Sequence, residues 1–212
     1  NIALFLLIVI FMSVYLYGYY TIKKGEETPT QTTLDVAVIH PFIKTEESLG
    51  IAGYKYYKEM LLNALAKKPD IVVLPENAFP SLVINESTNL PTNYIDIEIQ
   101  KIYDEFISIS LENPKSSIVA GFHTEIDNKR YNSTVVFENG LIVSIYHKQF
   151  LLPFAEYVPK ILENKITLFE SLEKGARNKN LKIKNFSVTA LICSEIIFPQ
   201  LSSVKPSNFI IN

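Results

Sequence analysis

The sequence predicts an α/β domain with a mixed β-sheet, preceded by one transmembrane helix. An uncharged apolar run opens the chain, at residues 2–20. Short apolar segments then alternate with segments of helical periodicity, which is the pattern of strand–helix–strand units. Further along, Asn139-Gly140 separates two apolar runs, and this pair is typical of a β-hairpin because tight hairpin turns require positive φ angles. Crossover units give parallel strands and hairpins give antiparallel ones, so the sheet is expected to be mixed.

The transmembrane helix is predicted at residues 1–22. The run IALFLLIVIFMSVYLYGYY carries no charge and is long enough to cross a bilayer. A signal peptide is the alternative, but it would have a basic segment before the apolar run and small residues after it. Aromatic residues instead crowd one end of the run, as in the interfacial belt of a membrane helix. They are Tyr15, Tyr17, Tyr19 and Tyr20.

Residues 23–33 (KKGEETPTQTT) are expected to form a polar linker, and residues 34–212 a catalytic domain. The chain starts with Asn1 almost inside the apolar helix, and its last apolar run stops at residue 212. We therefore expect the protein to continue beyond this sequence at both ends.

Composition narrows the function. The 212 residues suffice for one good-sized core, and the formal net charge of -2 gives no electrostatic support for a nucleic-acid partner. A single cysteine, Cys193, excludes an internal disulfide. The three histidines lie far apart without metal-ligand spacing, and no phosphate-binding glycine loop occurs, so neither a metal nor another cofactor is predicted.

The first strand–helix–strand unit follows the linker. LDVAVIH at residues 34–40 predicts a buried strand, and residues 54–68 place apolar side chains at helical spacing. Pro69 ends this helix, and IVVL at residues 71–74 predicts the second strand. Residues 94–110 fit a second helix better than a strand. The remaining predicted strands are residues 117–122, 133–138, 141–147, 187–192 and 208–211.

Three of these strands are followed by a side chain able to do chemistry. Glu76 follows the strand 71–74, Lys148 follows the second hairpin strand, and Cys193 follows the strand 187–192. Ligands gather at the carboxyl ends of strands in open α/β sheets, so the three side chains can converge. Each residue alone has a plainer interpretation, as a buried thiol or a solvated loop charge. Together they form a reactive set, because a glutamate can take the thiol proton and a lysine can stabilise thiolate and oxyanion.

Three segments carry a family resemblance: LPENAFP (74–80), YHKQFLLPFAEYVP (146–159) and LICSEIIF (191–198). They resemble the signature segments of the nitrilase superfamily, which has a Glu-Lys-Cys triad. The second segment more narrowly resembles the apolipoprotein N-acyltransferase branch. The resemblance covers residues 34–212 and implies a nitrilase-like αββα sandwich.

The resemblance also implies roles for individual residues. Glu76 matches the general base, Lys148 the lysine that stabilises the oxyanion and Cys193 the nucleophile. Glu156 matches a second glutamate that supports the site. Glu195 falls on an acidic position of the branch, where it is expected to be a structural partner rather than a catalyst.

Three positions depart from the family pattern. Ala155 stands where a glycine is usual, Ser194 where an aromatic is usual, and Asn77 where threonine or serine is usual. The last two adjoin the proposed catalytic residues, so they bear on acceptor or acyl-chain preference more than on the chemistry.

The function implied by the resemblance is lipoprotein maturation. A membrane acyltransferase would move a fatty acyl chain from a phospholipid, through a cysteine thioester, to the N-terminal amine of an apolipoprotein. The family places such a domain on the periplasmic side of the bacterial inner membrane. Apolar residues near the three segments would contact lipid, with plain core packing as the alternative for each. They are Phe79, Phe150, Leu151, Leu152, Phe154 and Tyr157.

Two other functions remain open from the sequence. A membrane-tethered amidase or nitrilase would use the same three residues on a small C–N substrate, with water as acceptor. A non-catalytic, membrane-anchored interaction domain would keep the fold without the chemistry.

Overall fold

The computed structural model describes residues 2–26, 33–41, 50–79, 82–85, 90–91, 97–162, 164–165, 171–176, 180–202 and 207–212. It divides into two compact units, Asn1–Leu34 and Asp35–Asn212. The predicted linker at 23–33 lies mostly outside the described residues, and its first four residues continue the preceding helix.

The first unit is helix α1, Ile2–Glu26. Its segment Ile2–Lys23 is long and apolar enough to span a membrane. The hydroxyls of Ser13 and Thr21 donate to the carbonyls of Val9 and Tyr17, one turn back, at 2.7 and 2.8 Å. These hydroxyls therefore need no water, which suits a helix in hydrocarbon.

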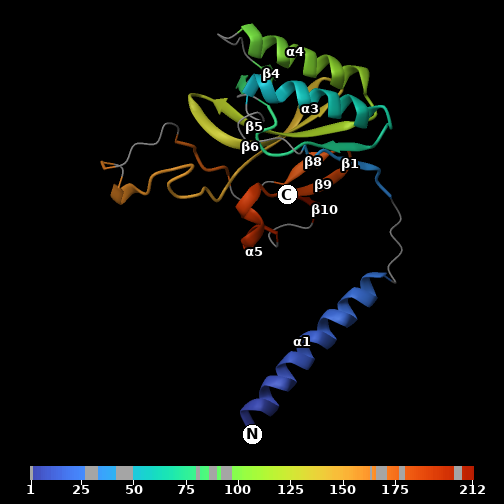
Figure 1. Cartoon of the computed structure of the whole chain (residues 1–212), viewed down its shortest axis with the longest axis vertical. Helices are drawn as coiled ribbons and strands as arrows, with labels where there is room; N and C mark the ends of the chain where they lie inside the picture. The colour runs from blue at the N-terminus through green and yellow to red at the C-terminus, as the bar shows by residue number, and fades with distance from the viewer. Residues whose placement is uncertain are drawn as a thin grey trace. The chain divides into compact units, whose positions relative to one another are not determined.

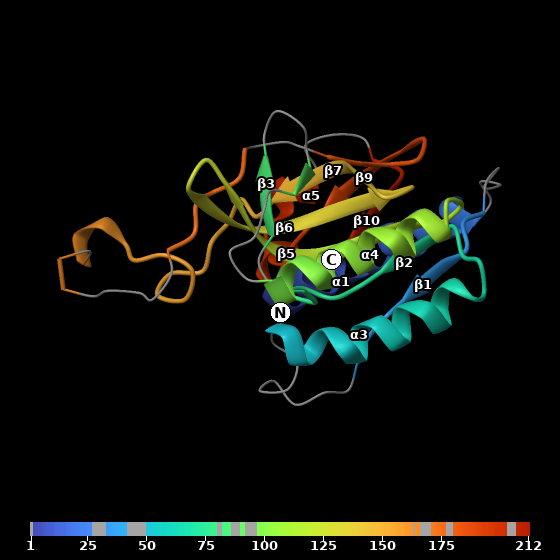
Figure 2. The same cartoon turned by 90° about the horizontal axis from the view of Figure 1, so that it is seen from above.

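The second unit is layered (Figure 1). Helices α3, Gly50–Leu65, and α4, Ile97–Glu112, lie side by side over one face of a seven-stranded sheet, as Figure 2 shows from above. A three-stranded sheet lies on the other side of the large one. Both helices turn apolar side chains toward the large sheet, which explains the helical spacing in the sequence.

The large sheet contains β1 (Val36–Val38), β2 (Ile71–Val73), β3 (Leu82–Asn85), β4 (Leu90–Pro91), β5 (Ser117–Ile126), β6 (Lys129–Glu138) and β7 (Leu141–His147). The small sheet contains β8 (Leu181–Ile183), β9 (Phe186–Ala190) and β10 (Phe209–Ile211). Short helices η1 (Lys160–Leu162), η2 (Cys193–Ile197) and α5 (Pro199–Ser202) complete the described elements.

The large sheet is mixed, as predicted. Strands β1, β2 and β5 are parallel, whereas β5, β6 and β7 are antiparallel. The β6–β7 turn has Asn139 at φ 51° and Gly140 at φ 74°, which confirms the predicted hairpin. In the small sheet β9 pairs in parallel with β10 and antiparallel with β8.

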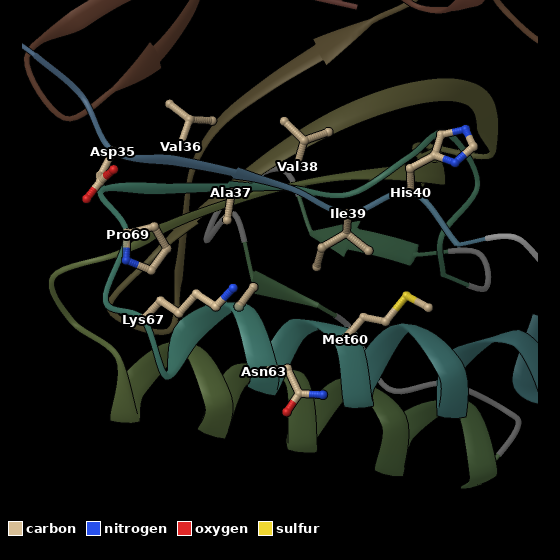
Figure 3. A pocket seen from close by; sticks show the side chains of 11 residues that line it. Asp35, Val36, Ala37, Val38, Ile39, His40, Met60, Asn63, Lys67 and Pro69 are labelled. Carbon is tan, nitrogen blue, oxygen red and sulfur yellow. The ribbon is translucent and has the colours of Figure 1, made fainter.

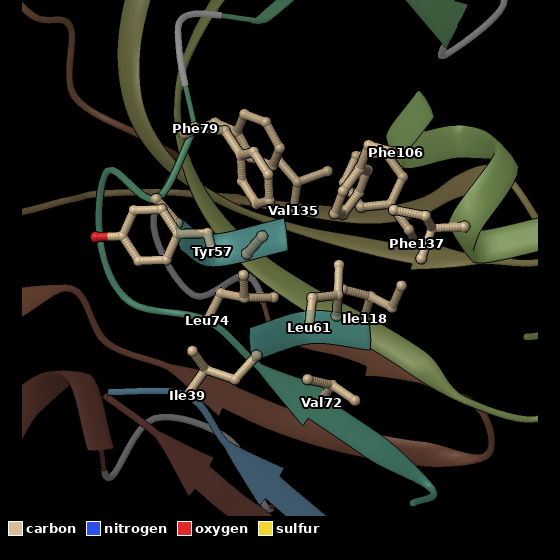
Figure 4. Close-up of a cluster of buried hydrophobic side chains, with 14 of the residues drawn as sticks. Ile39, Tyr57, Leu61, Val72, Leu74, Phe79, Phe106, Ile118, Val135 and Phe137 are labelled. Atoms are coloured by element: carbon tan, nitrogen blue, oxygen red, sulfur yellow. The ribbon is translucent and has the colours of Figure 1, made fainter. Parts of the chain in front are cut away.

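The main core lies between the two helices and the large sheet, and aromatic rings fill it (Figure 4). Phe79 stacks on Phe122 with ring centroids 5.1 Å apart. Phe106 meets Phe79 and Phe137 edge-on at 4.7 and 4.8 Å. Edge-to-face and offset contacts of this kind stabilise a core beyond simple area burial.

Three of the described strands were not predicted, and several predicted strands extend beyond the observed ones, such as residues 34–40 against β1. The short strands β3, β4 and β8 hold together by pairing with distant partners, so a single-sequence pattern carries little sign of them. Strand β9 ends at Ala190 instead of the predicted residue 192, because the chain then turns into η2.

Leu61 and Leu62 provide a matched test of this packing. Leu61 is fully buried on α3, whereas its neighbour Leu62 is 42% exposed. Replacing Leu61 by alanine leaves a cavity in the core and should lower the free energy of unfolding by about 2–5 kcal/mol. Leu62→Ala should lower it by about 0.5 kcal/mol or less. Urea denaturation of both variants measures the difference, and equal losses would contradict the described orientation of α3.

Candidate active site

Glu76 lies in the turn that leaves strand β2. This turn packs against the backbone of β5, where the Gly121 amide donates to the carbonyl of Pro75 at 3.3 Å. A Cβ at Gly121 would lie 2.7 Å from both Glu76 Cα and the Pro75 oxygen. Only glycine permits so close an approach, so Gly121 fixes where the backbone of Glu76 sits.

Lys148 follows directly after strand β7 and is 1% exposed. Its Nζ donates to Glu156 Oε1 at 2.8 Å. Its backbone is held on both sides, since its amide donates to the Asn132 carbonyl and its carbonyl accepts from the Gly175 amide, each at 2.8 Å. A buried ammonium requires a charged partner, and Glu156 supplies it.

Glu156 has several donors around its carboxylate. Besides Lys148, the Asn132 side chain donates to Oε1 at 3.0 Å and the Leu152 amide donates to Oε2 at 2.8 Å. Burial alone would raise the pKa of Glu156, but these hydrogen bonds and the Lys148 charge hold it below the ordinary value of 4.5. Glu156 is therefore a carboxylate that forms an ion pair with the buried Lys148.

Cys193 begins η2, directly after the buried pair Leu191 and Ile192. It is exposed and has φ 53°, in the left-handed region that a non-glycine residue rarely adopts. Strained turns between a strand and a helix present nucleophiles in other enzymes. The conformation thus agrees with a thiol offered to a substrate.

Glu195 is completely buried and accepts four hydrogen bonds. Its donors are the amides of Gln149 and Phe150 at 2.6 and 3.0 Å, the amide of Ile192 at 2.9 Å and the Tyr146 hydroxyl at 2.9 Å. Burial, and then the charge of Glu195, raises the pKa of Tyr146, so its phenol stays neutral and donates. The carboxylate thereby ties the Cys193 turn to the segment after Lys148.

Glu76 and Cys193 line the same small cavity, of about 60 Å³, together with Asn132 and Ser133. Lys148 does not line this cavity but is linked to it by hydrogen bonds. Asn132 Nδ2 donates to Glu76 Oε1 at 2.6 Å and to Glu156 Oε1 at 3.0 Å, and Glu156 holds Lys148. The structure therefore links Glu76 and Lys148 in one hydrogen-bond network, and Cys193 lines the cavity that Glu76 also lines.

Two sheets supply this network, which the sequence interpretation did not anticipate. Glu76 and Lys148 follow strands of the large sheet, whereas Cys193 follows β9 of the small sheet. The site lies between facing sheets and not along one sheet edge. Asn132 and Ser133 were also missed as site residues: Asn132 lies before the predicted strand, which began at residue 133 whereas β6 begins at Lys129, and Ser133 was predicted only as a strand residue.

A larger groove, of about 610 Å³, lies between strand β1 and helix α3 (Figure 3). Ala37 and Ile39 point into it from the strand, and Met60 and Asn63 line it from the helix. The candidate site residues do not line this groove, so the larger cavity is not the one that holds them. These residues are Glu76, Lys148, Glu156, Cys193 and Glu195. Among the residues that the structure describes, no group of three or more acidic, histidine or cysteine side chains could hold a metal ion.

The family model for carbon-nitrogen hydrolases matches residues 51–205. The chain belongs to the carbon-nitrogen hydrolase family. This confirms the resemblance to the nitrilase superfamily that the three segments suggested.

Curated relatives of this carbon-nitrogen hydrolase family member are apolipoprotein N-acyltransferases, the branch that the second segment indicated. The protein of Aquifex aeolicus is 31% identical over 87% of this chain, and that of Rhizobium rhizogenes 28% identical over 86%. The chain spans 40% and 36% of the length of these two relatives.

Solved structures support the predicted nitrilase-like fold. A carbon-nitrogen hydrolase superfamily protein of Xanthomonas campestris has a TM-score of 0.53 and 16% identity, covering 86% of this chain and 66% of its own. Nit3 of Saccharomyces cerevisiae, a nitrilase superfamily member, has a TM-score of 0.52 and 14% identity, covering 80% and 56%. The predicted fold class is confirmed.

The side chains expected to contact lipid fall into two groups. Phe79 and Leu151 are buried, and Phe79 lies in the aromatic core, so core packing accounts for them and corrects the expectation. Leu152 and Phe154 are 39% and 53% exposed. The other two are half-buried: Phe150 stacks on Phe198 at 4.5 Å, and Lys174 Nζ lies 5.4 Å from the ring of Tyr157.

The two departures next to the proposed catalytic residues share one property. Asn77 Oδ1 and Ser194 Oγ are buried and have no hydrogen-bond partner among the described residues. Asn77 also has a left-handed φ of 54°. Ser194 therefore neither fills space as an aromatic would nor bonds through its hydroxyl here. Ala155, the third departure, is exposed, which agrees with a minor steric change.

Gly121→Ala tests the fixed position of Glu76. The new Cβ would overlap the backbone at Pro75 and Glu76, so the turn must move away from the cavity. We expect alkylation of Cys193 by iodoacetamide at pH 7 to slow by about tenfold or more, since a displacement of about 1 Å at a reacting group can cost that much. Gly18→Ala is the control, because nothing lies within 4 Å of its Cβ position. Equal alkylation rates in both variants would show that Gly121 does not hold the site.

The pH dependence of stability tests the Glu156 network. Its folded pKa lies below the ordinary 4.5, so its contribution to stability is fully present above that value and is lost as pH falls through the folded pKa. Glu156→Gln should therefore flatten the fall in unfolding free energy between about pH 5 and 3. Denaturant titrations across this range measure it, with the exposed Glu173→Gln as control. An unchanged slope in Glu156→Gln would count against the network.

Proposed function

We propose that this chain carries the catalytic domain of an apolipoprotein N-acyltransferase. It would transfer a fatty acyl chain from a membrane phospholipid to the N-terminal amine of an apolipoprotein. The observation that carries the proposal is the network in which Glu76 and Cys193 share one cavity while Lys148 is tied to it through Asn132 and Glu156. The names of the curated relatives supply the substrate class.

In the first step Glu76 accepts the proton of the Cys193 thiol, and the thiolate attacks the ester carbonyl of the phospholipid. A C–S bond forms, and the carbonyl π electrons become an oxyanion. Lys148, with a backbone N–H near Ser194, stabilises this charge. When the intermediate collapses, the C–O bond breaks, the lysophospholipid leaves with the proton from Glu76, and a thioester remains on Cys193.

In the second step the free α-amine of a lipid-modified N-terminal cysteine attacks the thioester. Glu76 accepts a proton from this amine as the C–N bond forms. Collapse breaks the C–S bond and releases the N-acylated protein, and the Cys193 thiolate takes back the proton. Glu156 keeps Lys148 paired throughout, and Glu195 keeps the Cys193 turn beside the Lys148 segment.

Exposed apolar side chains near Cys193 support a lipid substrate. Leu152 and Phe154 lie in the segment after Lys148, and Ile196 and Ile197 of η2 are 58% and 69% exposed. Exposed apolar clusters of this kind mark contact with a membrane or an apolar ligand. Together with α1, they favour a domain working at a bilayer surface, which we assign to the periplasmic face of the bacterial inner membrane.

Cys193→Ala tests the covalent step. Vesicles of phosphatidylethanolamine and phosphatidylglycerol with radiolabelled acyl chains should transfer label to the full chain through a bond that hydroxylamine cleaves. Label on Cys193→Ala should fall by at least about 10³-fold, because the nucleophile is gone. Circular dichroism shows whether the variant remains folded.

Two results would favour the other functions. Turnover of small amides by the wild type, without any label from phospholipid, would indicate a hydrolase that uses the same residues with water as acceptor. An unreactive thiol that gives neither label nor turnover would indicate a non-catalytic interaction domain.

A further inference from the structure

Asn132 holds the carboxylate of Glu76. Among the described residues, this carboxylate accepts one side-chain hydrogen bond, from Asn132 Nδ2 at 2.6 Å. Glu76 is exposed and lies in a turn, whereas Asn132 is 2% exposed and lies within strand β6. We propose that Asn132 is the positioning residue that orients the Glu76 carboxylate toward the cavity it shares with Cys193. This inference rests on the proposed function, in which Glu76 accepts the thiol proton.

The strand makes Asn132 a rigid donor. Strand β6 is paired on both sides, with β5 and with β7. In addition, the carbonyl of Asn132 accepts the Lys148 amide at 2.8 Å. A group fixed by a central strand can hold a side chain on a turn more accurately than the turn itself can.

The orientation of the amide follows from its partners. Nδ2 lies within 3.0 Å of two carboxylate oxygens, one from Glu76 and one from Glu156. Carboxylates only accept hydrogen bonds, so the flipped amide would place Oδ1 against both. The observed orientation leaves Oδ1 buried without a partner among the described residues. An asparagine with a purely structural role would be expected to avoid this unfavourable arrangement, so the two carboxylates determine it.

Asn132 also balances the charges of the site. Glu76 and Glu156 both approach one nitrogen, and the ammonium of Lys148 bonds to Glu156. The two protons on Nδ2 give each carboxylate a hydrogen bond, which favours the charged form of both. Further titratable groups surround the pair: Cys193 lines the same cavity, Glu195 and Tyr146 bond to each other nearby, and His123 stands opposite Asn132 in the β5–β6 ladder.

Replacing Asn132 should change how the rate of Cys193 alkylation depends on pH. Without the amide donor, the two carboxylates face each other with less compensation and take up a proton at higher pH. The part of the profile where the alkylation rate falls with falling pH, its acid limb, should then move to higher pH. Protonated Glu76 cannot accept the thiol proton. A loss of packing alone would lower the rate by the same factor at every pH.

The experiment measures alkylation of Cys193 by iodoacetamide between pH 5 and 9 in the full chain in detergent micelles. Asn132→Leu should move the acid limb up by about one pH unit and slow the reaction at pH 7 by about 10–100-fold. Asn132→Asp adds a third carboxylate and should move the acid limb to a still higher pH. Asn132→Ser keeps one hydroxyl donor and should lie between wild type and Asn132→Leu. The matched controls Asn180→Leu and Asn180→Asp remove an amide that bonds the Ser187 hydroxyl, and should leave the profile in place.

The proposal is overturned if Asn132→Asp and Asn132→Ser keep the wild-type acid limb and change only the overall rate. Should Asn132→Leu fail to fold, the aspartate and serine variants still decide the question. Acyl label from phospholipid vesicles is measured on the same samples. Wild type without label, but with the shifted limb in the variants, would reject the acyltransferase and retain the role of Asn132.

Discussion

The arrangement of the candidate site depends on one buried carboxylate, that of Glu195. Cys193 follows a strand of the small sheet, and Lys148 follows a strand of the large sheet. The relative position of the two segments therefore depends on contacts between the two sheets. Glu195 meets this requirement by accepting hydrogen bonds from both sides at once, from Ile192 before the cysteine and from Gln149 and Phe150 after the lysine. Burying a carboxylate is unfavourable unless its oxygens are fully bonded, and these donors, with Tyr146, provide that compensation.

Nearer the cavity, a second buried charge, that of Lys148, is also compensated by a bonded partner, whereas the carboxylate of Glu76 stays accessible to solvent. Lys148 is buried against Glu156, which is why its ammonium can persist away from water. Glu76 remains exposed, in a turn that packs closely against Gly121. Asn132 joins the two carboxylates, and the site thereby combines one buried ion pair with one accessible base.

Exposed and strained residues follow both Cys193 and Lys148 in the chain. Cys193 has a left-handed backbone, and the following Ile196 and Ile197 expose their side chains. The segment after Lys148 also exposes Leu152 and Phe154, the latter with a left-handed φ of 66°. Such strain persists only where surrounding contacts over-determine the conformation, and Glu195 supplies those contacts on one side of each segment.

The sequence by itself determined the features that rest on local signals. The apolar run predicted α1, helical spacing predicted α3, and Asn139-Gly140 predicted the β6–β7 hairpin, because each depends on neighbouring residues alone. Only the tertiary structure decided which sheet supplies each reactive residue, that Phe79 belongs to the core, and that Asn132 bridges partners 56 and 24 positions away. Such contacts join segments that no periodicity relates, and they form only once strands far apart in the sequence have paired and the helices and the small sheet have packed on the large sheet.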